Sequence, residues 1–136
     1  MALLADDPLG RTRESPADLA PYREAFAEVD ADPRELLVVA EVAGAVVGTL
    51  QLTILRSLAR QGAQRAQLEA VRVHRDHRST GLGSALVRWA VEEAGRRGCD
   101  LVQLTSDASR SEAHAFYGGL GFAPSHVGFK LVLDSI

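Results

Sequence analysis

A glycine-bearing turn between a strand-like run and a helix-like run constrains this chain more than any other feature. The run from Leu68 to Val73 is rich in β-forming residues, and the pattern Arg78-x-x-Gly81-x-Gly83 follows it and opens the helix. The first N–H groups of a helix have no partner inside the helix, and the helix dipole adds partial positive charge there. The sequence therefore predicts an anion-binding loop at the carboxyl end of a strand.

The run after the loop has the apolar period of a helix. Its apolar stripe consists of Leu82, Ala85, Leu86, Trp89, Ala90 and Ala94. Arg96 and Arg97 suit the negative end of the helix dipole, and Gly98 is a common residue just beyond a helix end. A short strand is expected next, from Leu101 to Thr105. Strand, loop, helix and strand together predict a right-handed parallel crossover, which places the loop at an edge where α/β folds bind ligands.

The loop lacks the residues of two common nucleotide-binding motifs. No Gly-Lys-Ser/Thr is present, which excludes a P-loop for ATP or GTP, and the third glycine and acidic residue of the dinucleotide fingerprint are missing. Gly81 and Gly83 have no Cβ, so a pyrophosphate can approach the backbone closely, and Arg78 can add a bidentate positive charge. These features indicate a phosphorylated cofactor of another kind.

A second pattern lies downstream, in a predicted helix that ends at Gly121. Ser109-x-x-Glu112 has the spacing of a capping box and predicts the start of this helix. The helix carries the pattern Ala113-x-x-x-Tyr117-x-x-x-Gly121-Phe122.

The two patterns together resemble motifs A and B of the GNAT superfamily, the acyl-CoA-dependent N-acyltransferases. The resemblance runs from about Ser15 to the C-terminus. It departs from the family at Arg110, where asparagine is usual, and at Arg75, where proline is frequent. The resemblance implies acetyl-CoA as co-substrate, with its pyrophosphate on the loop.

The cofactor-binding residues that the resemblance implies lie mostly at the end of the strand and in the loop. They are Val71, Arg72, Val73, Arg78, Ser79, Thr80, Gly81, Leu82, Gly83, Ser84 and Tyr117. In this family the strand before the loop carries a bulge, which implies that the N–H of Val71 or Val73 receives the oxyanion of the reaction. Basic residues around the turn would attract the phosphates of the cofactor.

Tyr117 and Glu69 are the implied catalytic residues. A tyrosine hydroxyl, with a pKa of about 10, is a suitable acid for a departing thiolate. Glu69 stands at the strand position where many members of the family have a substrate-facing glutamate, which implies that it is the general base, directly or through water; Asp107 is the second candidate. The expected reaction is direct acetyl transfer to the primary amine of a small molecule in a ternary complex, without an intermediate on Cys99.

The remaining elements are expected to complete one mixed α/β domain over residues 1–136, with central antiparallel strands and one parallel crossover. Ser15-Pro16 predicts the start of a helix that ends before Asp32-Pro33. Ala43-Gly44 predicts a hairpin. The other strands are expected at Leu36–Val42, Ala45–Leu55, Ala66–Val73 and Gly128–Leu133.

The first strand of the family's fold is expected to be missing. Only Met1 to Ala5 precede the helix-breaking residues Asp6-Asp7-Pro8 and Gly10. The strand at Leu36–Val42 would then be an open sheet edge without an internal lysine or proline, and we expect a homodimer that buries it.

Composition narrows the class of protein. The net charge of −3 predicts no nucleic-acid partner, and no apolar run approaches the ~20 residues that span a membrane, so a cytoplasmic location is expected. A single cysteine and four histidines without ligand spacing predict no metal site. A non-catalytic acyl-CoA-binding module, a protein N-acetyltransferase and a protein-interaction domain stay open as alternatives.

Overall fold

The computed structural model of the chain describes residues 2–5, 14–15 and 17–133. The chain forms two compact units, Met1–Leu104 and Thr105–Ile136, and each is described by itself.

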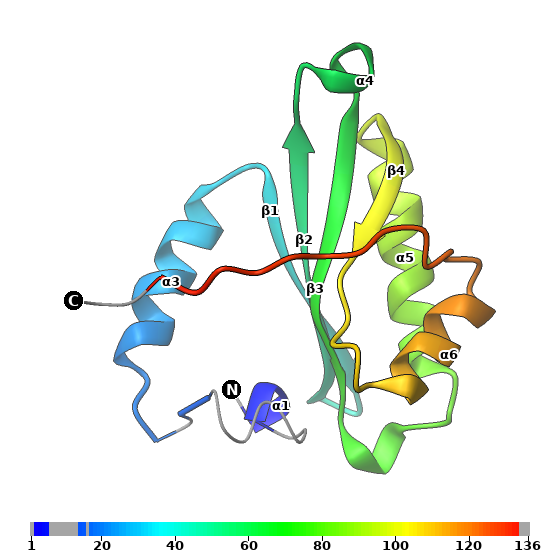
Figure 1. Cartoon of the computed structure of the whole chain (residues 1–136). Helices are drawn as coiled ribbons and strands as arrows, with labels where there is room; N and C mark the ends of the chain where they lie inside the picture. Colours follow the sequence, from blue (N-terminus) through cyan, green and yellow to red (C-terminus); the bar gives the residue numbers. More distant parts are fainter. Residues whose placement is uncertain (1, 6–13, 16, 134–136) are drawn as a thin grey trace. The chain divides into compact units, whose positions relative to one another are not determined.

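The first unit is a four-stranded sheet with helices (Figure 1). Its elements are α1 (Ala2–Ala5), α3 (Ala20–Ala31), β1 (Glu35–Val42), β2 (Ala45–Arg56), α4 (Ala59–Gly62), β3 (Gln64–Val73), the 3-10 turn η1 (Arg75–His77), α5 (Leu82–Arg96) and β4 (Cys99–Leu104). The strand order is β1-β2-β3-β4. The first two pairs are antiparallel, and β3 and β4 are parallel. The predicted mixed α/β fold with one parallel crossover is confirmed.

The hydrophobic core lies between one face of the sheet and α5. Leu52 pairs with Leu68 and Ile54 with Ala66, so the even-numbered side chains of β2 and β3 share this face. The helix contacts β2, β3 and β4. Its buried residues are Leu86, Val87, Ala90 and Ala94. The predicted stripe is therefore wrong at Ala85, which is exposed, and at Trp89, which is 39% exposed, because the helix turns Val87 toward the sheet instead.

The β1–β2 hairpin is present where it was predicted. Ala43 and Gly44 have φ angles of 52° and 81°, the positive values that a two-residue type I′ turn requires. β1 is an edge strand of the sheet, and no strand precedes it among the described residues. The expected breakers Asp6-Asp7-Pro8 and Gly10 lie outside the described residues.

The first long helix begins later than predicted. α3 starts at Ala20 with Leu19 as its N-cap, so Ser15 is not the capping residue. The backbone N–H of Ser15 instead donates to the Tyr22 hydroxyl (2.7 Å). The Asp18 carboxylate accepts from the N–H of Ala20 (3.2 Å), which supplies a local cap at the later position.

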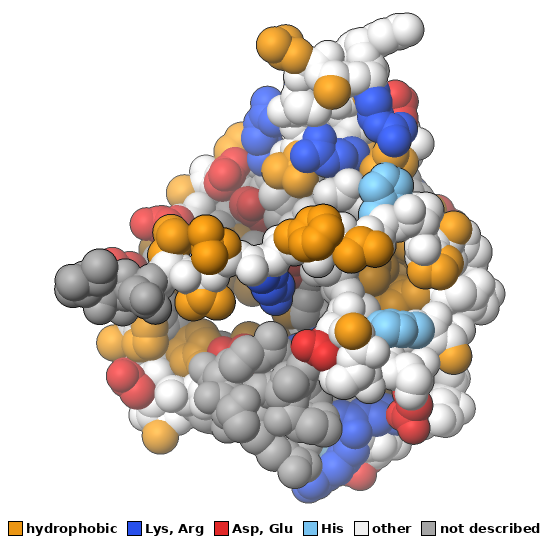
Figure 2. Space-filling model, in the orientation of Figure 1, with side chains coloured by type: hydrophobic (Ala, Val, Ile, Leu, Met, Phe, Trp, Pro, Cys, Tyr) orange, Lys and Arg blue, Asp and Glu red, His pale blue; other side chains and the backbone are white. Residues whose placement is uncertain are grey.

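The second unit contains one helix, α6 (Ser111–Gly119), among its described residues. The predicted capping box is wrong, because Arg110 is the N-cap and the Ser109 hydroxyl donates to Asp107 Oδ1 (2.6 Å). A last strand was predicted at Gly128–Leu133, but the structure has no strand there. In Figure 2 hydrophobic side chains lie along this segment on the visible face.

Candidate active site

A bulge interrupts β3 just before the loop. Glu69 pairs with Gln51 and Arg72 pairs with Thr49, so Ala70 and Val71 together oppose Leu50. Ala70 adopts a left-handed backbone angle, φ 51°. A bulge leaves the extra residue outside the ladder of hydrogen bonds and bends the strand. The bulge lies at the Val71 position named from the sequence, whereas Val73 pairs regularly with Gly48.

The turn from β3 to α5 is held by its own hydrogen bonds. His74 Nδ1 accepts from the N–H of Asp76 (3.1 Å), and the N–H of His77 donates to the His74 carbonyl (2.8 Å). The Arg78 guanidinium donates from Nε to the Val73 carbonyl (3.1 Å). The side chain of Arg78 therefore stays close to the end of β3, between the bulge and the helix.

The N-terminus of α5 has no side-chain cap. Its N-cap is Gly81 (φ 88°, ψ −1°), and Ser79 before it is also left-handed, φ 63°. No atom lies within 4 Å of the place where a Cβ on Gly81 would stand. Thr80, between Ser79 and Gly81, does not have a positive φ, so left-handed residues alternate with another conformation here. Backbone that alternates between right- and left-handed residues can turn its N–H groups toward one side and form an anion-binding concavity. The loop therefore fits a pyrophosphate group on bare backbone.

Polar side chains surround Glu69 on its face of the sheet, and the apolar Leu37 and Val39 lie on the same face at β1. This face has four hydrogen bonds that cross or follow the strands. Gln103 Nε2 donates to Gln67 Oε1 (3.0 Å), and Gln67 Nε2 donates to Glu69 Oε1 (2.7 Å). Glu35 Oε2 accepts from Gln51 (3.0 Å) and from the Thr53 hydroxyl (2.8 Å).

The Glu69 carboxylate is exposed and is oriented by Gln67. An exposed carboxylate with one hydrogen-bonded oxygen leaves its second oxygen able to take a proton. Sequence reasoning named Glu69 but missed Gln67 and Gln103, which belong to no motif. The available signal was the period of two along β3, which puts residues 67 and 69 on one face.

Asp107, the second candidate base, accepts hydrogen bonds just before α6. Its Oδ1 accepts from the Ser109 hydroxyl (2.6 Å) and from the Ser109 N–H (2.9 Å). These bonds lower the pKa of the Asp107 carboxyl below its ordinary value, the side-chain bond most strongly. A carboxylate with a lowered pKa is a weaker base.

Tyr117 lies in α6, in the second unit. Its ring is half-buried between two other aromatic rings, with centroid distances of 5.1 Å to Phe116 and 5.7 Å to Phe122. Both contacts are edge-to-face, which holds the ring of Tyr117 in one orientation. The structure places the other named residues (the ends of β3 and the loop) in the first unit, and the role of Tyr117 beside them stays a prediction.

Three further observations concern metal ligands, the Cys99 thiol and membranes. Within the described ranges, no three histidine, cysteine or acidic side chains are grouped as metal ligands would be. Burial raises the pKa of the Cys99 thiol, and the neighbouring Asp100 adds to the rise. No helix in the described part of the chain is long and apolar enough to cross a membrane.

Comparison with known proteins adds to this geometry. Residues 3–122 match the model of the acetyltransferase (GNAT) family. The chain is 31% identical over 116 residues to an aminoalkylphosphonate N-acetyltransferase of Salmonella typhimurium, covering 85% of this chain and 75% of that protein.

Solved structures are also similar. A transcriptional regulator from Bacillus halodurans is 45% identical with a TM-score of 0.92, covering 97% of this chain and 89% of that one. An acetyltransferase from Trypanosoma brucei is 26% identical with a TM-score of 0.71, covering 97% and 89%.

The chain therefore belongs to the acetyltransferase (GNAT) family. It is an acyltransferase that depends on acetyl-CoA, the co-substrate of that family.

Proposed function

We propose that this protein transfers the acetyl group of acetyl-CoA to the primary amine of a small molecule. The observation that carries the proposal is the N-terminus of α5, which has left-handed residues before it, no side-chain cap and open space at Gly81. We assign the pyrophosphate of acetyl-CoA to the N–H groups from Ser79 to Ser84, with Arg78 as the nearby positive charge. Arg72, Val73 and Tyr117 complete the predicted cofactor-binding set.

The amine must lose a proton before its nitrogen can attack the thioester carbonyl. We assign this proton to Glu69, directly or through a water. The attack forms a C–N bond and an oxyanion, which the N–H of Val71 in the bulge would stabilise. The C–S bond then breaks and the thiolate of CoA takes a proton from Tyr117. The nitrogen of the new amide releases its second proton to solvent, and solvent reprotonates Tyr117. A typical general acid contributes about 10²–10⁴-fold to the rate.

The class of acceptor rests on two supports. The polar face around Glu69 suits a small polar amine, and the relative from Salmonella typhimurium is named for an amine that bears a phosphonate. An aminoalkyl compound with an anionic group is therefore the first acceptor class to assay. The cytoplasmic location, the single domain over 1–136, the homodimer and the absence of a metal, of a nucleic-acid partner and of a membrane partner remain predictions.

A glycine pair provides a test of the loop. Gly81 (φ 88°) and Gly44 (φ 81°) both have left-handed angles and open space around a Cβ, so alanine should destabilise both sites similarly, by about 1 kcal/mol. We expect Gly81→Ala to weaken acetyl-CoA binding at least tenfold in calorimetry and Gly44→Ala to leave the affinity unchanged. The loop assignment is wrong if both variants bind acetyl-CoA like the parent.

Release of CoA, followed with a thiol reagent and a panel of aminoalkyl acids and plain amines, tests the activity itself. Turnover with any small amine supports the proposed function. Acetyl-CoA binding without turnover of any amine, while lysine-bearing peptides are acetylated, would instead identify a protein N-acetyltransferase.

A further inference from the structure

A row of polar residues crosses the whole sheet on the face that carries Glu69. Glu35 of β1 pairs with Thr53 of β2, and Thr53 pairs in turn with Gln67 of β3. Gln67 also pairs with Gln103 of β4. Side chains that are paired across strands lie on the same face. The row divides into two hydrogen-bonded groups, because Glu35 accepts from Thr53 whereas Gln67 bonds to Gln103 and to Glu69.

The two amides beside Glu69 can be oriented in one way. An ionised carboxylate can only accept hydrogen bonds, so the amide of Gln67 turns its NH2 group toward Glu69 Oε1 (2.7 Å). The amide oxygen of Gln67 then faces Gln103, which donates to it from Nε2 (3.0 Å). The result is a directional chain from Gln103 through Gln67 to Glu69, in which each bond polarises the next.

This chain lies where β3 and β4 stop pairing. The parallel ladder ends at the pair of Leu68 with Leu104, so Glu69 is the first residue of β3 beyond it. The bulge of β3, whose N–H is assigned to the oxyanion, follows directly. Gln67 and Gln103 lie on the paired part of the two strands. Their bonds therefore connect the carboxylate at the open end of β3 to the part of the sheet that backbone hydrogen bonds hold in place.

We propose that Gln67 is a positioning residue for acetyl transfer and that Gln103 acts through it. The inference rests on the proposed function, in which Glu69 takes a proton from the amine. An exposed glutamate rotates about its side-chain bonds, and a hydrogen bond to one oxygen restricts these rotations. Gln67 holds Oε1 of Glu69, which leaves Oε2 as the atom that receives the proton and later passes it to solvent. A catalytic group that is held in its productive geometry reacts faster than one that samples many geometries.

A double-mutant cycle separates positioning from a merely structural role. Gln67→Leu keeps the approximate size of the side chain and removes the donor. We expect kcat to fall about tenfold or more, since misplacement by about 1 Å can cost about 10²-fold. KM for the amine and the affinity for acetyl-CoA should stay close to those of the parent. In the Glu69→Gln background, Gln67→Leu should have no further effect on kcat, because no base is left to position.

Two more variants complete the kinetic test. Gln103→Leu should lower kcat less than Gln67→Leu does and should add nothing to it, because Gln103 reaches the base through Gln67. Gln64→Leu is the matched control on the same strand. It removes a glutamine side-chain bond to the Arg97 carbonyl (3.1 Å) at the other end of β3 and should keep the kcat of the parent. An equal loss from Gln67→Leu in both backgrounds would show a structural role and overturn the proposal.

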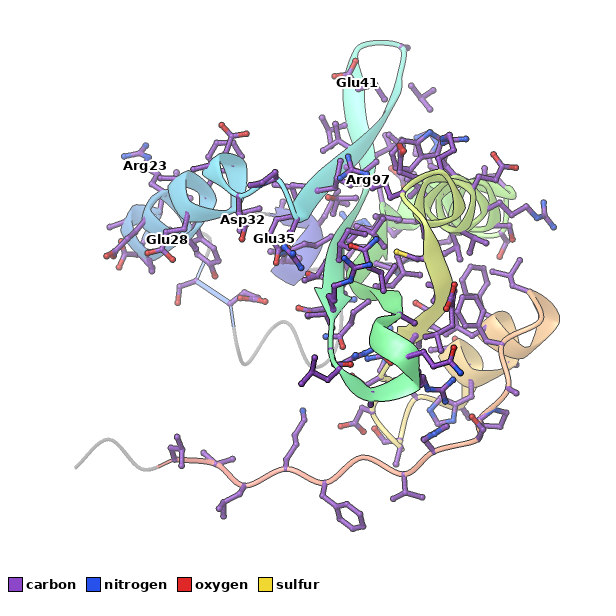
Figure 3. The ribbon with its side chains drawn as sticks, turned by 90° about the horizontal axis from the view of Figure 1, so that it is seen from above. Arg23, Glu28, Asp32, Glu35, Glu41 and Arg97 are labelled. Carbon is purple, nitrogen blue, oxygen red and sulfur yellow. The ribbon has the colours of Figure 1, made fainter. Side chains whose placement is uncertain are left out.

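Nuclear magnetic resonance tests the chain of bonds without any acetyl acceptor. The side-chain N–H signals of Gln67 and Gln103 should both shift when Glu69→Gln removes the charge at the end of the chain. Glu35→Gln is the control, because Glu35, at the start of β1 in Figure 3, accepts from Gln51 (3.0 Å). It should shift the signal of Gln51 and leave those of Gln67 and Gln103 unchanged. An unshifted Gln67 signal in Glu69→Gln would overturn the proposal.

These measurements distinguish failure of the positioning role from failure of the proposed function. If no amine is turned over, the proposed function is wrong and the positioning role is wrong with it. If amines are turned over and Glu69→Gln is slow, but Gln67→Leu keeps the kcat of the parent, the positioning role alone is wrong. A shifted Gln67 signal together with non-additive losses in kcat is the result that we expect.

Discussion

Two residues other than glycine have left-handed backbone angles on either side of the turn into α5. Ala70 has φ 51° in the bulge of β3, and Ser79 has φ 63° in the loop. Such angles cost about 1–3 kcal/mol each, and they cluster at functional sites in proteins. The side chains of both residues are exposed, so packing of these side chains does not require the conformation. Left-handed non-glycine residues also occur away from this turn, at Ala43, Arg60 and Gln61. At the scale of single residues, Ala70 and Ser79 are therefore consistent with the glycine pattern but do not by themselves locate the site.

Tyr117 can be tested against the other tyrosine of the chain. Tyr117→Phe removes one hydroxyl and keeps the aromatic cluster, so we expect kcat to fall about 10²–10⁴-fold with little change in acetyl-CoA affinity. Tyr22→Phe removes the hydroxyl that Ser15 and Glu14 contact, far from the proposed chemistry, and should leave kcat unchanged. If Tyr117→Phe retains kcat within about threefold of the parent, water supplies the proton.

Glu69 is tested by its effect on the pH profile. A general base must be deprotonated to act, so the activity of the parent should fall toward acid pH. We expect Glu69→Gln to lower kcat/KM about 10²–10⁴-fold and to flatten this acidic limb. Glu92→Gln, an exposed carboxylate on α5, is the control and should keep the parent profile. An unchanged acidic limb in Glu69→Gln would assign the proton transfer to another group.

At the scale of elements, close packing of α5 on β2 positions the anion site. Gly48 of β2 faces α5, and a Cβ at this position would lie 2.8 Å from Leu86 Cδ1. A side chain there pushes against the first half of the helix whose N-terminus forms the loop. The helix α5 can therefore pack this closely on β2 because residue 48 has no side chain.

Gly48→Ala should destabilise the protein by about 1–3 kcal/mol through overpacking. Urea unfolding measures this loss, and the double variant Gly48→Ala with Leu86→Val should recover part of it because the contacting methyl is removed. Gly119→Ala is the control, since nothing lies within 4 Å of a Cβ there. Additive effects of the Gly48 and Leu86 substitutions would show that the two positions are not coupled.

At the scale of the whole molecule, stability depends on the single core between the sheet and α5. The largest fully buried side chains are Leu50, Leu52, Leu68 and Val87. Leu52→Ala should reduce the free energy of unfolding by about 2–5 kcal/mol, through lost burial and a cavity. Leu58→Ala, at a side chain that is 96% exposed, should change it by less than about 0.5 kcal/mol. Equal effects in urea unfolding would contradict this location of the core.

The sequence by itself determined the features that depend on neighbouring residues. The Ala43-Gly44 hairpin, the loop before α5 and the end of α5 ahead of Gly98 require particular backbone angles or bonds within a few residues. Glycine patterns and helical periodicity report such local requirements directly. The family and the mixed α/β fold were therefore predictable.

Only the tertiary structure decided the features that depend on distant segments. The resemblance left the place of the bulge open between Val71 and Val73, and the register of β3 against β2 sets it at Ala70 and Val71. The hydrogen bonds that lead to Glu69 include one from Gln103 to Gln67, 36 residues apart. Residues 128–133 have the composition of a strand but are not a strand in the structure. Local preference could suggest that strand, but pairing between segments decides whether it forms.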